Sequence, residues 1–238
     1  MCGRFNLRTT GREVGDFFHT QTFPQFESLY NIAPTDAAMI IAAAGTIPEQ
    51  DLPSESEPRD SESPNQWAWA RWGLLPVWLK ELKGWAPRMN ARSETVASNG
   101  VFRSAFASRR CLVPSTGFYE WREVEKGKKQ PFHIQPQNQA FLPLAGVWEV
   151  WKKGEREILS CSVLTCEPNQ TMSAIHDRMP VILEQADWEQ WLDPAVTGKS
   201  LTDLLRPCPD DWLKVEPIAT SINNARNKSA EALQPLAH

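Results

Sequence analysis

The second residue of the chain is a cysteine, in the sequence MCGRF, and its position allows chemistry that an internal cysteine lacks. Methionine aminopeptidases remove Met1 when the second side chain is small, which would leave Cys2 with a thiol and a free α-amine two carbons apart. The reference pKa is about 7.7–8.0 for such an amine and about 8.5 for the thiol, so a fraction of each is nucleophilic near neutral pH. This pair can condense with an aldehyde and close a thiazolidine ring. The alternative is a small residue at a tolerant terminus.

A second candidate for chemistry is Glu120, in the sequence GFYEW. If this segment is a strand, its two-residue period places Phe118 and Glu120 on one face and Tyr119 and Trp121 on the other. A carboxylate among aromatic residues is costly unless it is paired or used, and desolvation would raise its pKa and suit it to proton transfer. The alternative is a glutamate on an edge strand with its face in water.

Two further segments carry polar side chains beside predicted elements. IHDRMPVIL places a charged cluster, His176, Asp177 and Arg178, between a short helix and a strand. PRMNARSET offers Asn90 and Arg92 just before a predicted helix. A lone histidine more often has a structural role, and an asparagine in this place can merely cap a turn. Neither segment decides a function on its own.

The cysteines and the hydropathy indicate an intracellular protein. The chain has 238 residues and five cysteines, an odd number at irregular spacings. No apolar run is long enough to span a membrane, and the start has no signal-peptide core. We expect a reducing, cytoplasmic location, associated with the nucleoid in a bacterial host, without structural disulfides. Cys161 and Cys166 are separated by four residues in an apolar, strand-like run, so buried thiols are expected rather than zinc ligands.

The net charge of −4 is unevenly distributed along the chain. Residues 48–66 hold six acidic residues and one arginine, a charge of −5, which leaves +1 for the rest. This segment is rich in Ser, Pro and Glu and has few apolar residues, so we expect a solvated loop inserted between two strands. A nearly neutral body can carry a local basic cleft, so the charge permits a nucleic-acid partner without requiring one.

The hydrophobic patterns predict an α+β chain in which strands outnumber helices. The sequence TGREVGDFF opens with a capping box, Thr10 to Glu13, which predicts a short helix after an N-terminal strand. Further helices are expected at 93–98, 100–106, 184–193 and 200–206. Strands are expected at 37–43, 66–76, 110–114, 117–123, 130–134, 143–150 and 158–165. We therefore expect a single domain with a curved, mostly antiparallel, barrel-like β-sheet flanked by short helices.

Five segments in this order, MCGRF, YNIAPT, RMNARSET, GFYEW and IHDRMPVIL, resemble the motifs of the SRAP family (SOS-response-associated peptidase, also called abasic-site processing protein). The closing INNARNKSAEALQPL resembles the usual C-terminal end of that family. The resemblance covers a single SRAP domain over residues 1–236, apart from the acidic insert at 48–66. It implies a DNA-damage-response protein that crosslinks itself to abasic sites in single-stranded DNA. The N-terminal cysteine would form a thiazolidine with the ring-opened sugar and so shield the strand from cleavage.

The resemblance also implies the site residues. The catalytic residues of the family fall on Cys2, Asn90, Glu120 and His176. Glu120 would move protons during imine formation, His176 would protonate the sugar O4′ to favour ring opening, and Asn90 would hold the amine or a sugar hydroxyl. Contacts to DNA would fall on Arg4, Pro34, Trp78, Arg92, Trp121 and Arg178. We expect no cofactor or metal and a monomeric protein that acts on single-stranded DNA containing abasic sites by lyase-like, Schiff-base chemistry.

Two other classes of function stay open from the sequence. Cys2, His176 and Glu120 could form a thiol peptidase, which could act on other substrates or only remove its own Met1. A Cys–His pair within hydrogen-bond distance would favour this class. Alternatively, the chain, with its eleven tryptophans, could be a non-catalytic reader of single-stranded nucleic acid. Equal binding of intact and abasic DNA, without a covalent product, would favour the reader.

Overall fold

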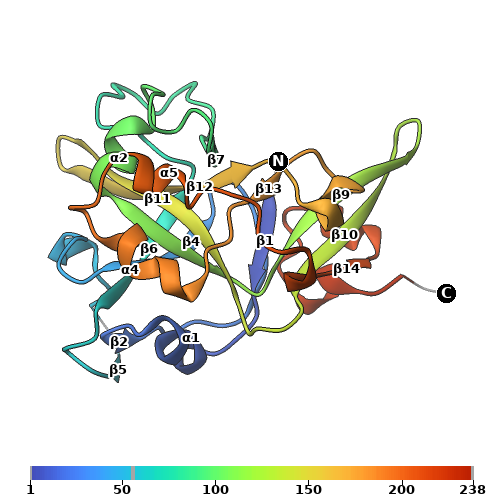
Figure 1. Ribbon diagram of the computed structural model, residues 1–238, viewed down its shortest axis with the longest axis horizontal. Helices are drawn as coiled ribbons and strands as arrows, with labels where there is room; N and C mark the ends of the chain where they lie inside the picture. The colour runs from blue at the N-terminus through green and yellow to red at the C-terminus, as the bar shows by residue number, and fades with distance from the viewer. Residues whose placement is uncertain (1, 55–56, 237–238) are drawn as a thin grey trace.

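Five strands of the chain close into a small barrel. The computed structural model describes residues 2–54 and 57–236 (Figure 1). The barrel strands pair in the order β11-β8-β4-β6-β12, and β12 pairs back to β11. Their bounds are β4 (Ala37–Ala43), β6 (Asn65–Trp72), β8 (Arg110–Ser115), β11 (Leu142–Lys153) and β12 (Arg156–Cys166). The β6–β12 pair is parallel and its neighbours are antiparallel, so the barrel is of mixed direction.

Two short strands extend the barrel sheet along β12. The strand β7 (Asn90–Arg92) runs parallel to β12, and β13 (Met179–Pro180) runs antiparallel to it. Both carry or adjoin predicted site residues, since Asn90 begins β7 and His176 lies just before β13. The barrel therefore brings together two motifs that are far apart in the sequence.

A second, fully antiparallel sheet lies beside the barrel, and β1 lies between the two in Figure 1. Its order is β14-β10-β9-β1-β3. Its strands are β1 (Arg4–Leu7), β3 (Leu29–Ile32), β9 (Gly117–Glu125), β10 (Lys128–Pro136) and β14 (Leu213–Pro217). The short strand β1 is inserted between β3 and β9, with Arg4 opposite Tyr119 and Asn6 opposite Gly117. This pairing brings the beginning of the chain next to the strand that carries Glu120.

The helices are short and surround the sheets. They are α1 (Gly11–Phe18), α2 (Arg103–Ser108), α3 (Gln170–Ser173), α4 (Trp188–Leu192) and α5 (Lys199–Thr202). The predicted capping box begins α1, where the Thr10 side chain accepts a hydrogen bond from the Glu13 N–H and the Glu13 carboxylate accepts one from the Thr10 N–H. Single 3-10 turns occur at Glu49–Asp51, Gln185–Asp187, Asp210–Trp212, Thr220–Asn223 and Ala230–Leu233. Among the described helices, none is both long and apolar enough to cross a membrane.

The acidic segment 48–66 follows β4, and its last two residues, Asn65 and Gln66, begin β6. Within its described part, β5 (Glu57–Pro58) pairs with β2 (Thr22–Phe23), and Arg59 forms an ion pair of 3.2 Å with Asp16. Most of its side chains are exposed or half-buried, while Ser63, Asn65 and Gln66 are buried where the segment joins the barrel. Residues 55 and 56 of the predicted insert lie outside the described residues. Contacts at its second half therefore hold this segment against α1.

The predicted α+β class and barrel-like, mostly antiparallel sheet are confirmed, but some helix predictions are wrong. Residues 93–98 form consecutive turns instead of a helix, and Asn90 lies on a strand rather than before a helix. The segment SETVAS is rich in Ser and Thr, whose hydroxyls compete for backbone groups, as the Ser98 hydroxyl does by donating to the Thr95 carbonyl. The helices predicted at 100–106 and 200–206 are shorter and shifted, and that at 184–193 begins as a 3-10 turn.

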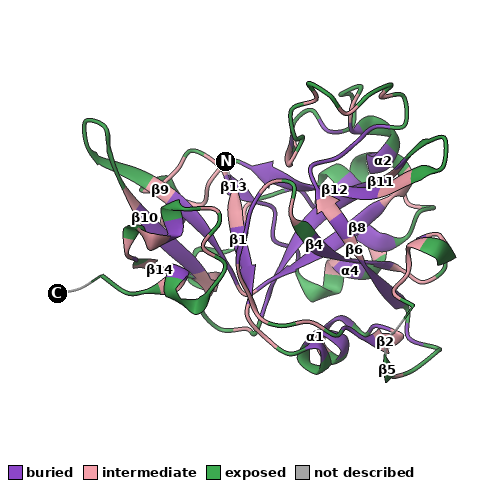
Figure 2. Cartoon of the chain, turned by 180° about the vertical axis from the view of Figure 1, so that it is seen from behind, coloured by how far each residue is buried: buried purple, intermediate pink, exposed green. Residues whose placement is uncertain are grey.

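Burial is concentrated in the barrel and in the adjoining strands β1 and β9 (Figure 2). The main core includes Phe5, Phe118 and Trp72, and the Phe5 and Trp72 rings meet edge to face with centroids 4.9 Å apart. All five cysteines are free thiols and buried, which confirms the burial predicted for Cys161 and Cys166. Tyr119 and Trp121 pack in a separate cluster, which confirms the predicted alternation along β9. The strand β9 therefore divides two apolar environments.

A buried polar network fixes β1 against β9 and β10. The Asn6 amide donates to the Tyr119 hydroxyl at 2.7 Å and contacts His133 Nε2 at 2.8 Å, and its oxygen accepts from the Thr116 hydroxyl at 2.6 Å. Because both protons of the amide are used in this way, His133 Nε2 must be the acceptor and the ring neutral. Burial lowers the pKa of His133 to about 3, which agrees with a neutral ring. The Tyr119 hydroxyl in turn donates to the Tyr30 carbonyl at 2.7 Å, so the network reaches β3.

We expect Asn6→Ala to lower the free energy of unfolding by about 3 kcal/mol, because it leaves several buried polar groups without partners. Urea denaturation at neutral pH measures this change. The matched control is Asn138→Ala, since that asparagine is exposed and donates only to the Asp211 carbonyl at 3.3 Å. The control should change the free energy by about 0.5 kcal/mol or less. Equal effects of the two substitutions would contradict a special role for the network.

Candidate functional site

A polar cleft of about 620 Å³ opens over β9, the hairpin β9–β10 and the segment before β13. Four of the predicted site residues line it: Arg4, Glu120, Trp121 and His176. Its lining also includes Gly127, Lys129 and Asn223, which the sequence reasoning missed. Lys129 belongs to the turn sequence EKGKK, and no local pattern indicates that this hairpin folds over Glu120. Asn223 belongs to the closing motif INNARN, which is the signal that could have identified it.

Glu120 is a buried acid in the wall of this cleft. Its strand lies between β1 and β10, where Glu120 is opposite Phe132, and only 3% of the residue is exposed. The alternative of a glutamate in water on an edge strand is therefore excluded. Burial raises the pKa of Glu120 to about 7. Near neutral pH the carboxyl group can therefore both accept and release a proton.

His176 faces Glu120 across the cleft, with its Nε2 4.0 Å from a Glu120 carboxylate oxygen. Its other ring nitrogen, Nδ1, accepts a hydrogen bond from the Arg178 N–H at 2.9 Å and lies 2.9 Å from the exposed Asp177 carboxylate. Desolvation lowers the pKa of His176, so the neutral ring is favoured near pH 7. With Nδ1 accepting, the proton of the neutral ring lies on Nε2, directed toward Glu120.

Cys2 and Asn90 form the inner part of the site. The Asn90 amide donates to the Cys2 carbonyl at 2.8 Å, which joins β7 to the beginning of the chain. The Cys2 thiol is fully buried, and its Sγ lies 3.8 Å from the Arg4 carbonyl. Burial, and next the Glu120 carboxylate, raise the pKa of this thiol well above its ordinary value. Cys2 is thus held as a neutral thiol within the electrostatic reach of Glu120.

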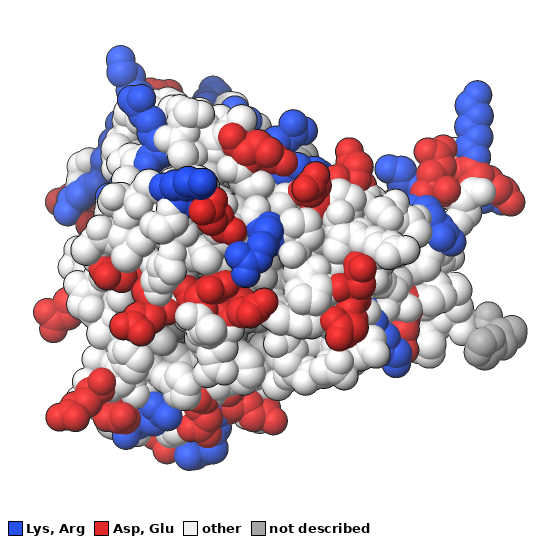
Figure 3. Space-filling view, in the orientation of Figure 1, with Lys and Arg blue, Asp and Glu red and all other residues white. Residues whose placement is uncertain are grey.

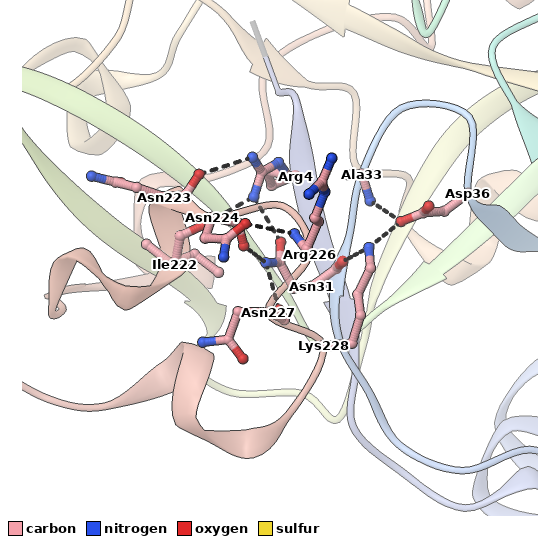
Figure 4. Close-up of polar contacts among 10 residues, drawn as sticks. All are labelled: Arg4, Asn31, Ala33, Asp36, Ile222, Asn223, Asn224, Arg226, Asn227 and Lys228. Carbon is pink, nitrogen blue, oxygen red and sulfur yellow. Dashed lines mark hydrogen bonds and ion pairs between the residues drawn. The ribbon is translucent and has the colours of Figure 1, made fainter.

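Arg4 is held rigidly at the edge of the cleft. Its guanidinium donates to Asn31 Oδ1 at 2.9 Å and to the Ile222 and Asn223 carbonyls at 3.0 and 3.4 Å (Figure 4). It also lies over the Trp121 ring, 5.8 Å from the ring centroid. The Trp121 indole N–H donates to Asn223 Oδ1 at 2.7 Å. A charged group and a flat aromatic face are therefore fixed side by side.

The other predicted contact residues lie outside the lining of the cleft. Arg178 is paired with Glu94 and donates to the Thr165 carbonyl at 2.5 Å, and its side chain is 12% exposed. Trp78 is 55% exposed and meets Trp85 edge to face, while Arg92 is exposed on β7 and Pro34 is half-buried. Trp78 and Arg92 are therefore open to solvent, whereas Arg178 is engaged within the protein.

The charge on the surface does not form one extended basic face. Figure 3 shows lysines and arginines interspersed with acidic residues over the visible face. In the cleft itself, two cationic residues, Arg4 and Lys129, adjoin one carboxyl group whose pKa is about 7. The favourable region for an anion is therefore small and local.

A comparison with protein families matches residues 1–225 to the model of SOS response associated peptidase (SRAP). Among curated proteins, the chain is 33% identical over 243 aligned positions to the abasic site processing protein YoaM of Bacillus subtilis, covering 100% of both chains. It is 32% identical over 188 positions to the abasic site processing protein HMCES of Xenopus tropicalis. That match covers 68% of this chain and 55% of the Xenopus protein.

Solved structures share the fold at lower sequence identity. A crystal structure of a protein from Bacteroides thetaiotaomicron has a TM-score of 0.80 at 22% identity and covers 99% of this chain and 100% of that one. One from Bordetella bronchiseptica has a TM-score of 0.73 at 22% identity and covers 92% of this chain and 100% of that one. The arrangement of barrel and antiparallel sheet therefore recurs in distant relatives.

The pKa of Glu120 makes the stability of the protein depend on pH. Its pKa in the folded state, about 7, lies above its ordinary value of 4.5, so the folded state holds a proton that the unfolded state has released. Stability should therefore fall as pH rises from about 4.5 to 7. The free energy of unfolding of Glu120→Gln minus that of wild type should increase by roughly 2–3 kcal/mol between pH 5 and pH 8.

Urea denaturation of both proteins at the two pH values measures this difference. Glu125→Gln is the matched control, because Glu125 is an exposed glutamate on the same strand, paired on the surface with Lys128. The free energy of unfolding of Glu125→Gln relative to wild type should change far less between the two pH values. A difference in free energy of unfolding between Glu120→Gln and wild type that stays constant with pH would contradict the raised pKa of Glu120.

Proposed function

Because this chain belongs to the SRAP family, we propose that it processes abasic sites in single-stranded DNA by forming a covalent crosslink through Cys2. The name of the relatives, abasic site processing protein, supports the substrate class. One observation carries the chemistry. A buried carboxyl group with a pKa of about 7, Glu120, lies within electrostatic reach of the cysteine that would begin the processed chain.

The first step needs the α-amine of Cys2, so the proposal requires removal of Met1. The freed amine adds to the C1′ aldehyde of the ring-opened sugar and forms a C–N bond, giving a carbinolamine. Loss of water from the carbinolamine gives an imine. Glu120 takes the proton from the attacking amine and returns one to the departing hydroxyl. A group whose pKa is about 7 can perform both transfers near neutral pH.

The thiol acts second. Its pKa is raised by burial, so the neutral amine is the better first nucleophile. The thiol sulfur adds to the imine carbon, its proton passes to the imine nitrogen, and the thiazolidine ring closes. This ring removes the reactive aldehyde from the strand, and the bound protein covers the lesion. No cofactor, oxidant or reductant is required for this sequence of steps.

His176 and Asn90 have supporting roles in the proposal. The neutral His176 ring, with its proton on Nε2, can donate a hydrogen bond to the sugar O4′, and its imidazolium form can protonate that oxygen and so favour ring opening before attack. Asn90 holds the backbone of Cys2 by the bond to its carbonyl and thereby orients the reacting groups. By microscopic reversibility the same groups would assist reversal of the crosslink.

We assign the nearest DNA contacts to Arg4 and Trp121, which are fixed at the edge of the cleft. Arginine would contact a phosphate, and stacking of a base on an aromatic face contributes about 1–3 kcal/mol. Trp78, Arg92 and Pro34 would extend the path of the strand from the cleft. Arg178 could contact a phosphate only if its pair with Glu94 opened.

A thiol peptidase is less well supported by the geometry. Cysteine proteases use a thiolate next to a histidine, whereas burial raises the pKa of Cys2 and His176 Nε2 faces Glu120. The family description includes the word peptidase, and removal of its own Met1 is the peptide-bond cleavage that this site would need. Intact mass of the purified protein tests whether one methionine is lost.

Crosslinking should depend on Cys2. The wild-type protein should shift on a denaturing gel with single-stranded DNA that contains an abasic site, and not with undamaged DNA. Cys2→Ser keeps the amine, so it should form an imine that borohydride traps, yet little heat-stable adduct. Stable crosslinking by Cys2→Ala at the wild-type level would contradict the assignment of Cys2 as the crosslinking residue.

Glu120 should act in the chemistry rather than in DNA binding. Glu120→Gln keeps the shape and a hydrogen bond but cannot shuttle a proton, so crosslinking should slow by about 100-fold, the low end of general acid–base effects, with DNA affinity near wild type. His176→Ala should also slow the approach to product. Both variants should release bound DNA more slowly. Single-turnover time courses at several pH values measure these rates, and wild-type rates in both variants would leave the two residues structural.

A further inference from the structure

The C-terminal segment Ile222–Lys228 lies against β1 and β3 beside the cleft (Figure 4). Its sequence, INNARNK, carries two cationic residues and no acidic one. Asn223, near its beginning, lines the cleft together with Arg4, from which it is 219 residues away in the sequence. Asn223 is thus part of the cleft wall, and the rest of the segment continues from it along β1 and β3.

Asn31 on β3 is the anchor of this segment. It is 1% exposed, and its amide nitrogen donates to the Asn224 carbonyl at 3.1 Å and the Asn227 carbonyl at 2.9 Å. Its side-chain oxygen accepts from Arg4 at 2.9 Å. One buried side chain therefore fixes both Arg4 and the C-terminal segment. Lys228 adds a second attachment, since its ammonium donates to the Asn31 carbonyl at 2.7 Å and pairs with Asp36.

Asn223 presents hydrogen-bond donors to the cleft. Its side-chain oxygen accepts from the Trp121 indole N–H at 2.7 Å, so the orientation of the amide is fixed. The amide nitrogen then faces away from the indole N–H, and the residue is exposed. These N–H groups share the lining of the cleft with Arg4 and Lys129, and such donors suit an oxyanion.

Arg226 is an exposed cation on the same segment. Its backbone N–H donates to Asn224 Oδ1 at 3.0 Å, which fixes the turn on which it stands. In the part of the chain that the structure describes, its guanidinium forms no hydrogen bond or ion pair. In Figure 4 its side chain extends to the same side of the segment as that of Arg4. An exposed guanidinium with no partner among the described residues is available to bind an anion.

We propose that Ile222–Lys228 is a phosphate-binding wall of the cleft, in which Arg226 contacts a phosphodiester of the single strand and the Asn223 amide donates to an oxygen of the same backbone. The inference deepens the function proposed above and rests on it for the nature of the ligand. Lys228 is excluded as a contact because Asp36 neutralises it. Asn31 is a positioning residue that holds the wall in place.

The test is noncovalent binding of an undamaged, fluorescently labelled single-stranded oligonucleotide, measured by anisotropy between 50 and 200 mM salt. Arg226→Ala should weaken binding on the order of fivefold for every sequence. It should also lower the slope of log affinity against log salt by about 0.7, the value for one phosphate contact on a single strand. Arg226→Lys should keep the slope, because it keeps the charge.

The matched control is Arg156→Ala, since Arg156 is an exposed arginine at the turn between β11 and β12 of the barrel and is not among the residues that line the cleft. It should change neither affinity nor slope. Asn223→Asp keeps an acceptor for Trp121 but replaces the donors by an anionic oxygen, so it should weaken binding at least as much as Arg226→Ala. Both positions are exposed, so the folded state should be retained, which circular dichroism checks.

The two proposals fail in different ways. If abasic DNA is crosslinked normally but Arg226→Ala and Arg156→Ala bind alike, the phosphate-binding wall is wrong and the proposed function stands. If wild type forms no covalent adduct yet Arg226→Ala loses affinity and slope, the wall stands as a nucleic-acid contact and the crosslinking proposal fails. Absence of any binding to single strands by wild type would overturn both.

Discussion

The insertion of β1 between β3 and β9 is the constraint on which the site depends. Its register places Arg4 opposite Tyr119 and Asn6 opposite Gly117, and a shift of one residue would turn every side chain of β1 to the other face. The buried network of Asn6 with Tyr119 and His133 opposes such a shift, because it can be satisfied in one register only. Cys2 is therefore held near Glu120 by pairing that begins two residues later.

Burial in this site works on the protonation states of its groups in a consistent direction. It disfavours charge on each of them, so the Cys2 thiol, the Glu120 carboxyl and the His176 ring are all moved toward neutral forms. A proton passed between two neutral groups leaves a pair of opposite charges, which a low-dielectric site disfavours, so each group keeps its neutral form until a ligand takes up or supplies a proton. The cationic residues Arg4 and Lys129 stand at the edge of the same cleft, where a charged ligand would arrive. The site thus separates proton transfer inside from charge recognition outside.

The sequence predicted local features well and spatial ones poorly. The alternation along β9, the capping box of α1 and the buried thiols follow from periods and residue types that a short window contains. The helix predicted at 93–98 is wrong because the residue pattern there is compatible with a helix and with consecutive turns, and tertiary contacts decide between the two. Lys129 reaches the cleft because the hairpin β9–β10 folds over it, and Asn31 donates to carbonyl groups of a segment distant in the sequence. Neither relation can be inferred from the residue types alone. Arg178 remains a predicted DNA contact, and its pairing with Glu94 depends on folding that a sequence motif does not display.

The attachment of Arg4 to the Ile222 carbonyl spans 218 residues, nearly the whole chain, and this has a consequence for synthesis on the ribosome. Among the described pairings of the antiparallel sheet, those of β1, β3, β9 and β10 can form once residue 136 has emerged, and the pairing of β10 with β14 and the bonds of Arg4 to the Ile222 and Asn223 carbonyls come last. Contacts of such long sequence separation form late and slowly. A nascent chain can form much of the barrel before Arg4, close to the N-terminal cysteine, has its final hydrogen-bond partners. The contacts that hold Arg4 should therefore be complete only after residues 222–228 have emerged from the ribosome.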